Sequence, residues 1–484
     1  MAVKLKPFNP RDISLSDDFI GFPLIQEELR EIVEYLGYLL KITEDGKDEI
    51  KRMLVAAESG SLFLGRTGAG KTHALHCVVN EVKKKGYYPV DGSLMYEKSV
   101  IDPKDVREFF DACRELAEDK PLLIVYDDAR QLLGSRQRRD SDYDNNHQQT
   151  RPMLSEFRRQ LDGLQYYNHP VHVIVTSATV IWHIDRQIAR RFSRHLRFPS
   201  PEDESRKSLF NYYLGKFGHD PGTIDVETLS FLMEGVVSGK IEEIVSKASY
   251  KADVDGGLTN KMLVKQIIRY LQGPPSDTSL TPEKKLNVAY HEFGGHTLPA
   301  YAVGLEPILV TITPSADGSY GRNFHRHSES IPPSSARYHF ANVITGMGST
   351  AVYQELEKSK EEGRMGDLTG SSKSALSLYA LKNPMVQMQM GEDDTYLSRG
   401  LFSDENRVEI EEEIKKIKDS ALEIARKIIT DYREEVVKFT EEHLVKKEIM
   451  VRSEILDVFN ELDVEPGKYY DLMCDALKKL DYPV

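Results

Sequence analysis

One short stretch of this chain constrains its fold more than any other. Residues 65–72 read Gly-Arg-Thr-Gly-Ala-Gly-Lys-Thr and fit the pattern G-x-x-x-x-G-K-[ST]. An apolar run, Ser61–Leu64, precedes them, and a helical pattern, Ala74–Val82, follows. A strand, a glycine-rich loop and a helix in that order form a phosphate-binding loop, because the glycines let the backbone wrap the phosphates and the helix N-terminus offers free N–H groups. The sequence therefore predicts a nucleotide site beside a parallel α/β sheet.

A second motif supplies carboxylates for the same site. The apolar run Leu122–Tyr126 ends in Asp127 and Asp128. Two carboxylates at a strand end pack poorly, but they suit a magnesium ligand followed by a base. We expect Lys71 to contact the β- and γ-phosphates and Thr72 to bind Mg²⁺. Asp127 is expected to hold the same ion, and Asp128 to polarise the attacking water.

Composition narrows the class of protein. A chain of 484 residues is long enough for two or three domains. The formal charge of −13 argues against a nucleic-acid partner. Cys77, Cys113 and Cys474 are far apart and are expected to be free thiols in a reducing compartment. No run of 18 apolar residues and no signal peptide is visible, so we expect a cytoplasmic protein without an integral membrane segment. A chain cut from a membrane-anchored protein would look the same, and that alternative stays open.

Composition shifts divide the chain into five parts. Residues 14–200 alternate short apolar runs with helical patterns, as expected for a nucleotide-binding α/β module. Residues 201–272 are charged and helical and are predicted to form a lid, and residues 273–282 contain the best linker signal. A mainly helical domain is expected over 283–465, followed by a C-terminal extension, 466–484.

A few elements within these parts can be predicted individually. Besides the two strands already named, Val171–Val175 is expected to be a buried strand of the α/β module. Gly134–Gln149 is polar and turn-rich, which predicts a mobile loop. The mainly helical domain has one strand-like insert, Ile308–Thr313.

Three further stretches complete a resemblance to a known family. They are Asp18–Gly21, Asp162–Leu164 and Asp185–Phe192. Together with the phosphate loop they resemble the AAA+ module of the FtsH family. The resemblance implies that Ile20 and Gly21 line the adenine pocket and that Thr179 occupies the sensor position. The predicted nucleotide-binding set is Ile20, Gly21, Gly65, Thr67, Gly68, Ala69, Gly70, Lys71, Thr72, Asp127 and Thr179.

The resemblance also implies a site completed by a second subunit. Arg190 and Arg191 fall where the family has arginine fingers, which reach the γ-phosphate bound by the neighbouring subunit of a hexamer. The fixed fork of a guanidinium suits a phosphoryl transition state. The chain departs from the family at Asp128, where Glu is usual, at Thr179, where Asn is usual, and in lacking Pro-Gly between the two arginines. These departures predict slower or altered ATP hydrolysis.

The motif that begins at His291 resembles the zinc-peptidase helix of the same family. The family pattern is H-E-x-x-H, but here His291, Glu292 and His296 give H-E-x-x-x-H. On a regular helix five residues rotate by about 500°, which leaves the two imidazoles roughly 140° apart, whereas four residues leave about 40°. A π-bulge absorbs one extra residue and would restore the alignment. Gly294 and Gly295 make such a distortion easier.

The resemblance implies a third metal ligand. Residues 363–368 match the family's G-x-x-N-D-L motif, except for glycine at the asparagine position, and place Asp367 as the ligand. We expect Asp367 on a turn before a helix, Ser371–Leu381. A His₂Asp set leaves a fourth zinc position for water, for which Glu292 is the expected general base. In the alternative, these residues are a polar helix and a cap within an inactive scaffold.

Taken together, the motifs and the resemblance to the FtsH family imply a hexameric ATP-dependent protease that uses ATP, Mg²⁺ and Zn²⁺ and acts on polypeptides. The fold is expected to be an α/β AAA+ module, a parallel sheet with a helical lid, followed by a mainly α-helical zinc-peptidase-type domain. Tyr96 is the aromatic residue available to grip an extended polypeptide. One alternative is an ATP-driven unfoldase whose inactive peptidase domain holds the ring together. Another is a nucleotide-dependent scaffold with little turnover.

Overall fold

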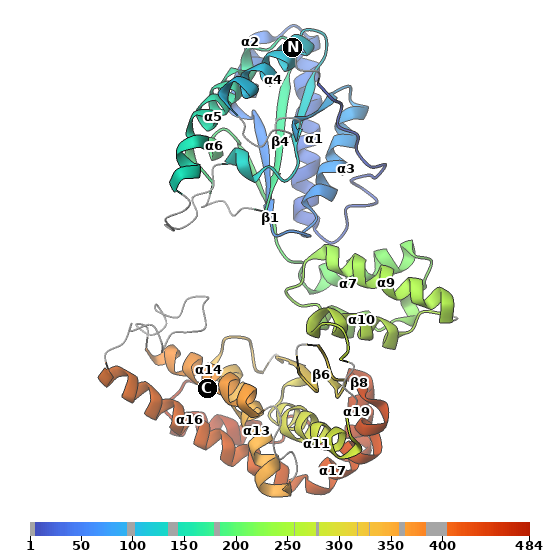
Figure 1. Cartoon of the computed structure of the whole chain (residues 1–484), viewed down its shortest axis with the longest axis vertical. Helices are drawn as coiled ribbons and strands as arrows, with labels where there is room; N and C mark the ends of the chain where they lie inside the picture. Colours follow the sequence, from blue (N-terminus) through green and yellow to red (C-terminus); the bar gives the residue numbers. More distant parts are fainter. Residues whose placement is uncertain are drawn as a thin grey trace. The chain divides into compact units, whose positions relative to one another are not determined.

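The computed structural model of the chain (Figure 1) describes residues 5–93, 102–133, 144–178, 184–255, 257–276, 280–316, 318–328, 330–357, 364–383 and 404–484. Tyr96 and Thr179 lie outside these ranges. The chain divides into two compact units. Unit 1 consists of Met1–Val226 and Met233–Thr259, and unit 2 of Glu227–Leu232 and Asn260–Val484. Because this division runs through the expected lid, the five-part division of the sequence stays a prediction.

Unit 1 is built on a five-stranded parallel sheet with strand order β2-β3-β4-β1-β5. Every residue of β3 and β4 is buried, and such continuous apolar runs are typical of parallel strands covered on both faces. Figure 1 shows α3 and α5 on opposite sides of these strands. The strands are β1 (Gly60–Gly65), β2 (Tyr88–Asp91), β3 (Leu122–Tyr126), β4 (Val171–Ser177) and β5 (Arg194–Phe198). All three predicted strands of this module are present.

Helices surround this sheet. The predicted helix Ala74–Val82 lies within α3. The prediction of a loop over Gly134–Gln149 is wrong for residues 144–149, which form the start of α5. Residues 134–143 lie outside the described ranges. The helices are α1 (Pro23–Glu44), α2 (Asp48–Ala57), α3 (Lys71–Lys84), α4 (Pro103–Leu116), α5 (Asp144–Gly163), α6 (Arg186–Ala189), α7 (Asp203–Lys216), α8 (Val226–Leu232) and α9 (Ser238–Asp255). Of these, α8 spans the division between the two units.

Unit 2 is mainly helical, as predicted, around one large apolar core. Its helices are α10 (Asn260–Gln272), α11 (Pro282–Glu292), α12 (Leu298–Ala302), α13 (Ala336–Leu356), α14 (Arg364–Lys382), α16 (Asp404–Asp431), α17 (Arg433–Lys438), α18 (Val445–Lys447), α19 (Arg452–Glu461) and α20 (Tyr470–Lys479). Two π-helical turns interrupt them, η6 (Phe293–Thr297) and η8 (Phe439–Leu444). Among the described residues, no helix is both long and apolar enough to span a membrane.

The strand-like insert of unit 2 belongs to a small antiparallel sheet. Its order is β7-β6-β8, with β6 (Glu306–Thr311), β7 (Arg322–Arg326) and β8 (Ile449–Val451). The sequence predicted only the first of these. The third is three residues long and pairs with a strand far away along the chain, so local pattern could not identify it.

Candidate functional site

The phosphate loop has the backbone conformation that its glycines permit. The helix α3 begins at Lys71, directly after Gly70, whose φ is +96°. Side chains rarely adopt this left-handed conformation, whereas glycine does so without steric cost. The loop borders a cavity of about 290 Å³. The predicted residues that line this cavity are Ile20, Thr67, Gly68, Gly70, Lys71, Thr72 and Asp128.

The remaining predicted residues of the nucleotide set lie around the cavity. Gly65 is the last residue of β1, and Ala69 is buried beneath the loop. Gly21 lies against helix α7, where its Cα faces Leu209. Lys71 Nζ donates to the carbonyl oxygens of Gly65 at 2.8 Å and Arg66 at 2.9 Å. These bonds offset the cost of holding a nearly buried ammonium group inside the loop.

Asp127 lies next to the threonine with which it was predicted to share Mg²⁺. Thr72 Oγ1 donates to both carboxylate oxygens of Asp127, at 3.0 and 3.2 Å. Thr176 Oγ1 donates to the same carboxylate from β4, at 2.5 Å. A carboxylate and a hydroxyl side by side at a helix N-terminus are oxygen ligands of the kind that Mg²⁺ prefers.

The two predicted arginine fingers have different surroundings. Arg191 forms a bidentate pair with Asp162, with Nε–Oδ1 and Nη2–Oδ2 both 3.0 Å, and its Nη1 donates to the Gln187 carbonyl at 2.7 Å. Its guanidinium is therefore engaged within its own chain. Arg190 is exposed.

Several residues of the nucleotide cavity were not predicted. Thr176 lines it from β4, and Tyr213, Ser238 and Glu242 line it from helices α7 and α9. The backbone N–H of Gly239 also donates to the Gly68 carbonyl of the loop, at 2.9 Å. These residues reach the cavity because their strand and helices pack against the phosphate loop, and no local sequence motif predicts that packing.

The second site lies where a distorted helix meets α14. Residues Phe293–Thr297 form the π-helical turn η6, in which the N–H of Leu298 bonds to the carbonyl of Phe293, five residues earlier. The extra residue between His291 and His296 is therefore absorbed by the π-bulge considered from the sequence. With this turn in place, the two imidazoles lie on the same side of the helix.

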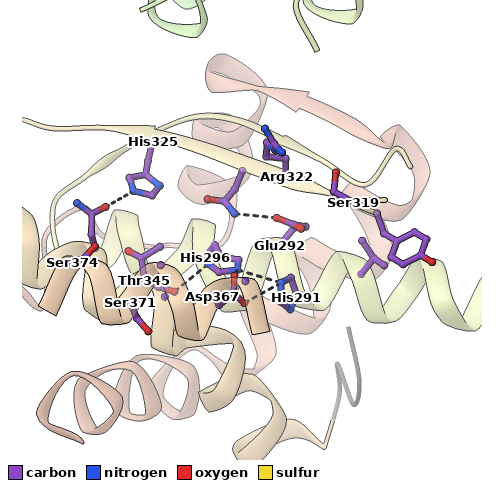
Figure 2. Close-up of a pocket in the computed structure, with 18 of the residues that line it drawn as sticks. His291, Glu292, His296, Ser319, Arg322, His325, Thr345, Asp367, Ser371 and Ser374 are labelled. Carbon is purple, nitrogen blue, oxygen red and sulfur yellow. Dashed lines mark hydrogen bonds and ion pairs between the residues drawn. The ribbon is translucent and has the colours of Figure 1, made fainter. Parts of the chain in front are cut away.

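Three potential metal-ligand residues converge beside this turn (Figure 2). His291 Nε2 lies 3.3 Å from Asp367 Oδ2, and His296 Nε2 lies 3.3 Å from Asp367 Oδ1. The two Nε2 atoms are 3.3 Å apart. Asp367 lies in the first turns of α14, so the prediction that it precedes the helix is wrong. The predicted helix start was too late, because the turn-like Gly366 and Gly370 lie inside α14.

The donor set fits a divalent metal such as zinc. Two imidazole nitrogens and a carboxylate oxygen are ligands that zinc takes in tetrahedral sites with one open position. His296 Nδ1 donates to the Thr345 carbonyl at 3.1 Å, which leaves the lone pair on Nε2, the atom that faces Asp367. The Oδ2 atom of Asp367 is buried and, apart from its 3.3 Å contact with His291 Nε2, has no hydrogen-bond partner among the described residues. A metal ion would satisfy that atom.

The charges of this cluster are coupled. Burial alone would lower the pKa of His296, but the hydrogen bond and negative charge of Asp367 outweigh it and raise that pKa. Burial opposes the charge of Asp367 too, yet His296 holds its pKa below the usual value. The pair thus stabilises its own charged form, and a metal ion that binds His296 Nε2 would take the place of a proton there.

Glu292 is positioned as an acid or base next to the cluster. It is buried and borders a cavity of about 740 Å³ that the metal-ligand candidates also line. Asn323 Nδ2, from β7, donates to Glu292 Oε2 at 3.0 Å (Figure 2). Burial raises the pKa of Glu292 to about 7, although His296 and Asn323 act in the opposite direction. A carboxyl group with this pKa exchanges a proton readily near neutral pH.

The sequence did not predict Asn323 or the polar residues at the other end of this cavity. His325, also on β7, donates from Nε2 to Asn342 Oδ1 at 3.1 Å, because Asn342 Nδ2 is bonded to the Tyr338 carbonyl. Alternation along β7 places Asn323 and His325 on one face. That pattern could have indicated them if the strand had been recognised.

Two family models match the segments of the chain that contain most residues of the two candidate sites. Residues 61–200 match the ATPase family associated with various cellular activities (AAA), and residues 278–458 match peptidase family M41. The chain is 25% identical to the ATP-dependent zinc metalloprotease FtsH 3 of Petrotoga mobilis, over 96% of the chain and 72% of the relative. It is 26% identical to the ATP-dependent zinc metalloprotease FtsH 2 of Phytoplasma mali, over 95% of the chain and 64% of the relative. Each alignment spans nearly the whole of this chain and therefore includes both matched segments.

The chain is thus similar to FtsH proteins along nearly its whole length. This FtsH-like chain covers less than two thirds of some relatives, for example 59% of the ATP-dependent zinc metalloprotease FtsH of Mycobacterium tuberculosis. Among solved structures, one chain of a complex described as E. coli MS115-1 HORMA:CdnC:Trip13 matches 57% of the present chain, with 19% sequence identity and a TM-score of 0.44. That structural likeness is too weak to carry an argument.

Proposed function

We propose that this FtsH-like chain couples ATP hydrolysis in unit 1 to hydrolysis of peptide bonds in unit 2. The observation that carries the proposal is the π-helical turn η6, which turns His291 and His296 toward Asp367 despite the extra residue. A regular helix with His296 turned away would instead have favoured the inactive-scaffold alternative. The substrates would be polypeptides, since the relatives with both matched units are named metalloproteases.

In the peptidase site, His291, His296 and Asp367 are the proposed zinc ligands. When bound there, zinc polarises the scissile carbonyl and lowers the pKa of a water molecule. Glu292 accepts the proton of the attacking water and delivers it to the leaving amine, a role that suits its pKa of about 7. Asn323 holds Glu292 through one carboxylate oxygen and leaves the other free to exchange the proton.

In the ATPase site, Lys71 binds the β- and γ-phosphates, and Thr72 with Asp127 holds Mg²⁺. Asp128 polarises the attacking water. The chain forms a ring, which we propose to be a hexamer, in which an arginine completes the site of the neighbouring subunit. Arg190 is our candidate for that contact because it is exposed, whereas Asp162 engages Arg191.

One set of measurements tests the whole assignment. Purified protein should contain about one zinc ion per chain and should hydrolyse ATP and an unfolded protein such as casein. Glu292→Gln should retain zinc and ATPase activity but lose proteolysis, and Lys71→Ala should lose ATPase activity but retain zinc. Full proteolysis by the Glu292→Gln variant, or a zinc-free wild type after zinc reconstitution, would refute the peptidase assignment.

A further inference from the structure

Thr176, near the end of β4, contacts three consecutive residues of the segment that follows β3. Its Oγ1 donates to Asp127 Oδ1 at 2.5 Å and accepts the backbone N–H of Asp128 at 2.8 Å. Its carbonyl oxygen accepts the backbone N–H of Ala129 at 2.9 Å. A single residue therefore fixes the side chain of the first carboxylate residue and the main chain of the next two.

The backbone at Asp128 shows why such an anchor matters. Its φ is +49°, in the left-handed region that non-glycine residues seldom adopt and that costs about 1 kcal/mol or more. Asp128 lines the nucleotide cavity in this conformation. The hydrogen bond from the Asp128 N–H to Thr176 holds the strained residue in place. Without that acceptor, the turn could relax and carry the carboxylate away from the cavity.

The hydroxyl group of Thr176 both donates and accepts. Asp127 accepts its one hydrogen, and one of its two lone pairs accepts the Asp128 N–H. Thr176 is 1% exposed and Asp127 is half-buried, so the bond to the charged carboxylate is partly shielded from water. Thr72 donates to the same carboxylate, but from the phosphate loop. Thr176 therefore holds Asp127 independently of anything that Thr72 does when nucleotide binds.

We propose that Thr176 is a positioning residue for ATP hydrolysis, which fixes Asp127 and Asp128 relative to each other. The proposal rests on the nucleotide function proposed above and adds a residue that neither the phosphate-loop motif nor the family resemblance identified. Through Thr176, strand β4 contacts both carboxylate residues directly. Valine has the same shape as threonine but can form neither side-chain bond, whereas serine can form both.

The test compares Thr176→Val and Thr176→Ser with the wild-type chain. The measurements are the steady-state rate of ATP hydrolysis against ATP and Mg²⁺, and binding of a fluorescent, non-hydrolysable ATP analogue with and without Mg²⁺. We expect Thr176→Val to lower kcat about 10- to 100-fold and to raise the Mg²⁺ concentration for half-maximal rate, because a charged hydrogen bond is lost. KM and analogue binding without Mg²⁺ should change less than about three-fold, and Thr176→Ser should recover most of kcat.

A matched control removes another threonine hydroxyl in unit 1. Thr43 Oγ1 donates only to the Leu39 carbonyl of its own helix, so Thr43→Val should retain wild-type kinetics. Wild-type kcat in Thr176→Val, or a serine variant as slow as the valine variant, would overturn the proposal. If the wild type itself does not hydrolyse ATP, the proposed function fails, but the analogue still reports on Thr176. In that case, identical Mg²⁺ dependence of binding in wild type and Thr176→Val would refute the positioning role.

Discussion

Gly348→Ala should disrupt the candidate zinc site without changing any ligand. Gly348 lies on α13, where that helix crosses the π-helical turn η6. A Cβ atom added to Gly348 would lie 1.9 Å from the carbonyl oxygen of Gly295. The same contact is tight from the other side, since a Cβ on Gly295 would lie 2.9 Å from the Cα of Ser349. The two backbones therefore approach as closely as glycine allows.

The size of the effect follows from these distances. Real Cβ contacts under 3.0 Å essentially never occur, so the Gly295 carbonyl must retreat from α13 by about 1 Å. Overpacking of this kind costs about 1–3 kcal/mol of unfolding free energy. The movement also stretches the bond from His296 Nδ1 to the Thr345 carbonyl, which orients the imidazole. Loss of such a supporting bond typically weakens metal binding about 10- to 100-fold.

The assay measures zinc affinity with a competing chelator, and thermal unfolding of the zinc-free and zinc-bound protein. Gly370→Ala on α14 is the control, because a Cβ there meets no atom within 4 Å and alanine favours a helix by about 0.5–1 kcal/mol. Gly348→Ala should lose zinc affinity and thermal stability, and Gly370→Ala should lose neither. Wild-type zinc affinity in Gly348→Ala would show that the helix crossing does not position His296.

Three other changes test separate features. Deleting Gly294 restores H-E-x-x-H, but it rotates the buried residues Leu298–Ala302 about the helix axis by about 100°. We therefore expect the variant to be unfolded or free of zinc, and a soluble, zinc-loaded variant would contradict this. Arg190→Ala should lower ATPase activity without lowering the melting temperature, whereas Arg191→Ala should lower both because it removes the ion pair with Asp162. Equal melting temperatures of the two variants would refute these different roles. Burial lowers the pKa of His172 to about 4, below its ordinary value of 6.5. The free energy of unfolding should therefore fall by about 3 kcal/mol as the pH falls from 6.5 to 4, because the unfolded chain binds the proton more readily than the folded one. Denaturant titration of the His172→Gln variant should not show this loss.

The sequence predicted those parts of the sites whose geometry is local. The phosphate loop is one continuous segment, so its pattern contains the strand, the turn and the helix start together. The rotation of a helix per residue is also local, and it was enough to infer that His291 and His296 need a π-turn. The same reasoning could not decide whether the turn forms, because that depends on what packs against it.

The parts that the sequence missed depend on distant segments. Thr176 reaches Asp127 only because β3 and β4 are neighbours in the parallel sheet, where Tyr126 is paired with Val175. Asn323 reaches Glu292 from a five-residue strand whose partner β6 was recognised alone. A polar residue on a short strand has the same local pattern whether it faces solvent or a catalytic group. Its role becomes visible only when the pairing is known.

The extra residue in the metal-binding helix is matched by a second distortion against which it packs. The π-helical turn η8 lies beside η6, and the rings of Phe293 and Phe439, the first residues of the two turns, are stacked with centroids 3.6 Å apart and an angle of 6°. Tyr290, on α11 just before η6, donates to Glu441 Oε1 of η8 at 2.8 Å. A π-turn is wider than a regular helix and would leave a poorly filled space against a regular neighbour. Because both helices widen at the point of contact, the core stays closed around Phe293, which is fully buried. The longer H-E-x-x-x-H spacing is therefore built into the packing of unit 2, and this packing holds the imidazoles in position toward Asp367.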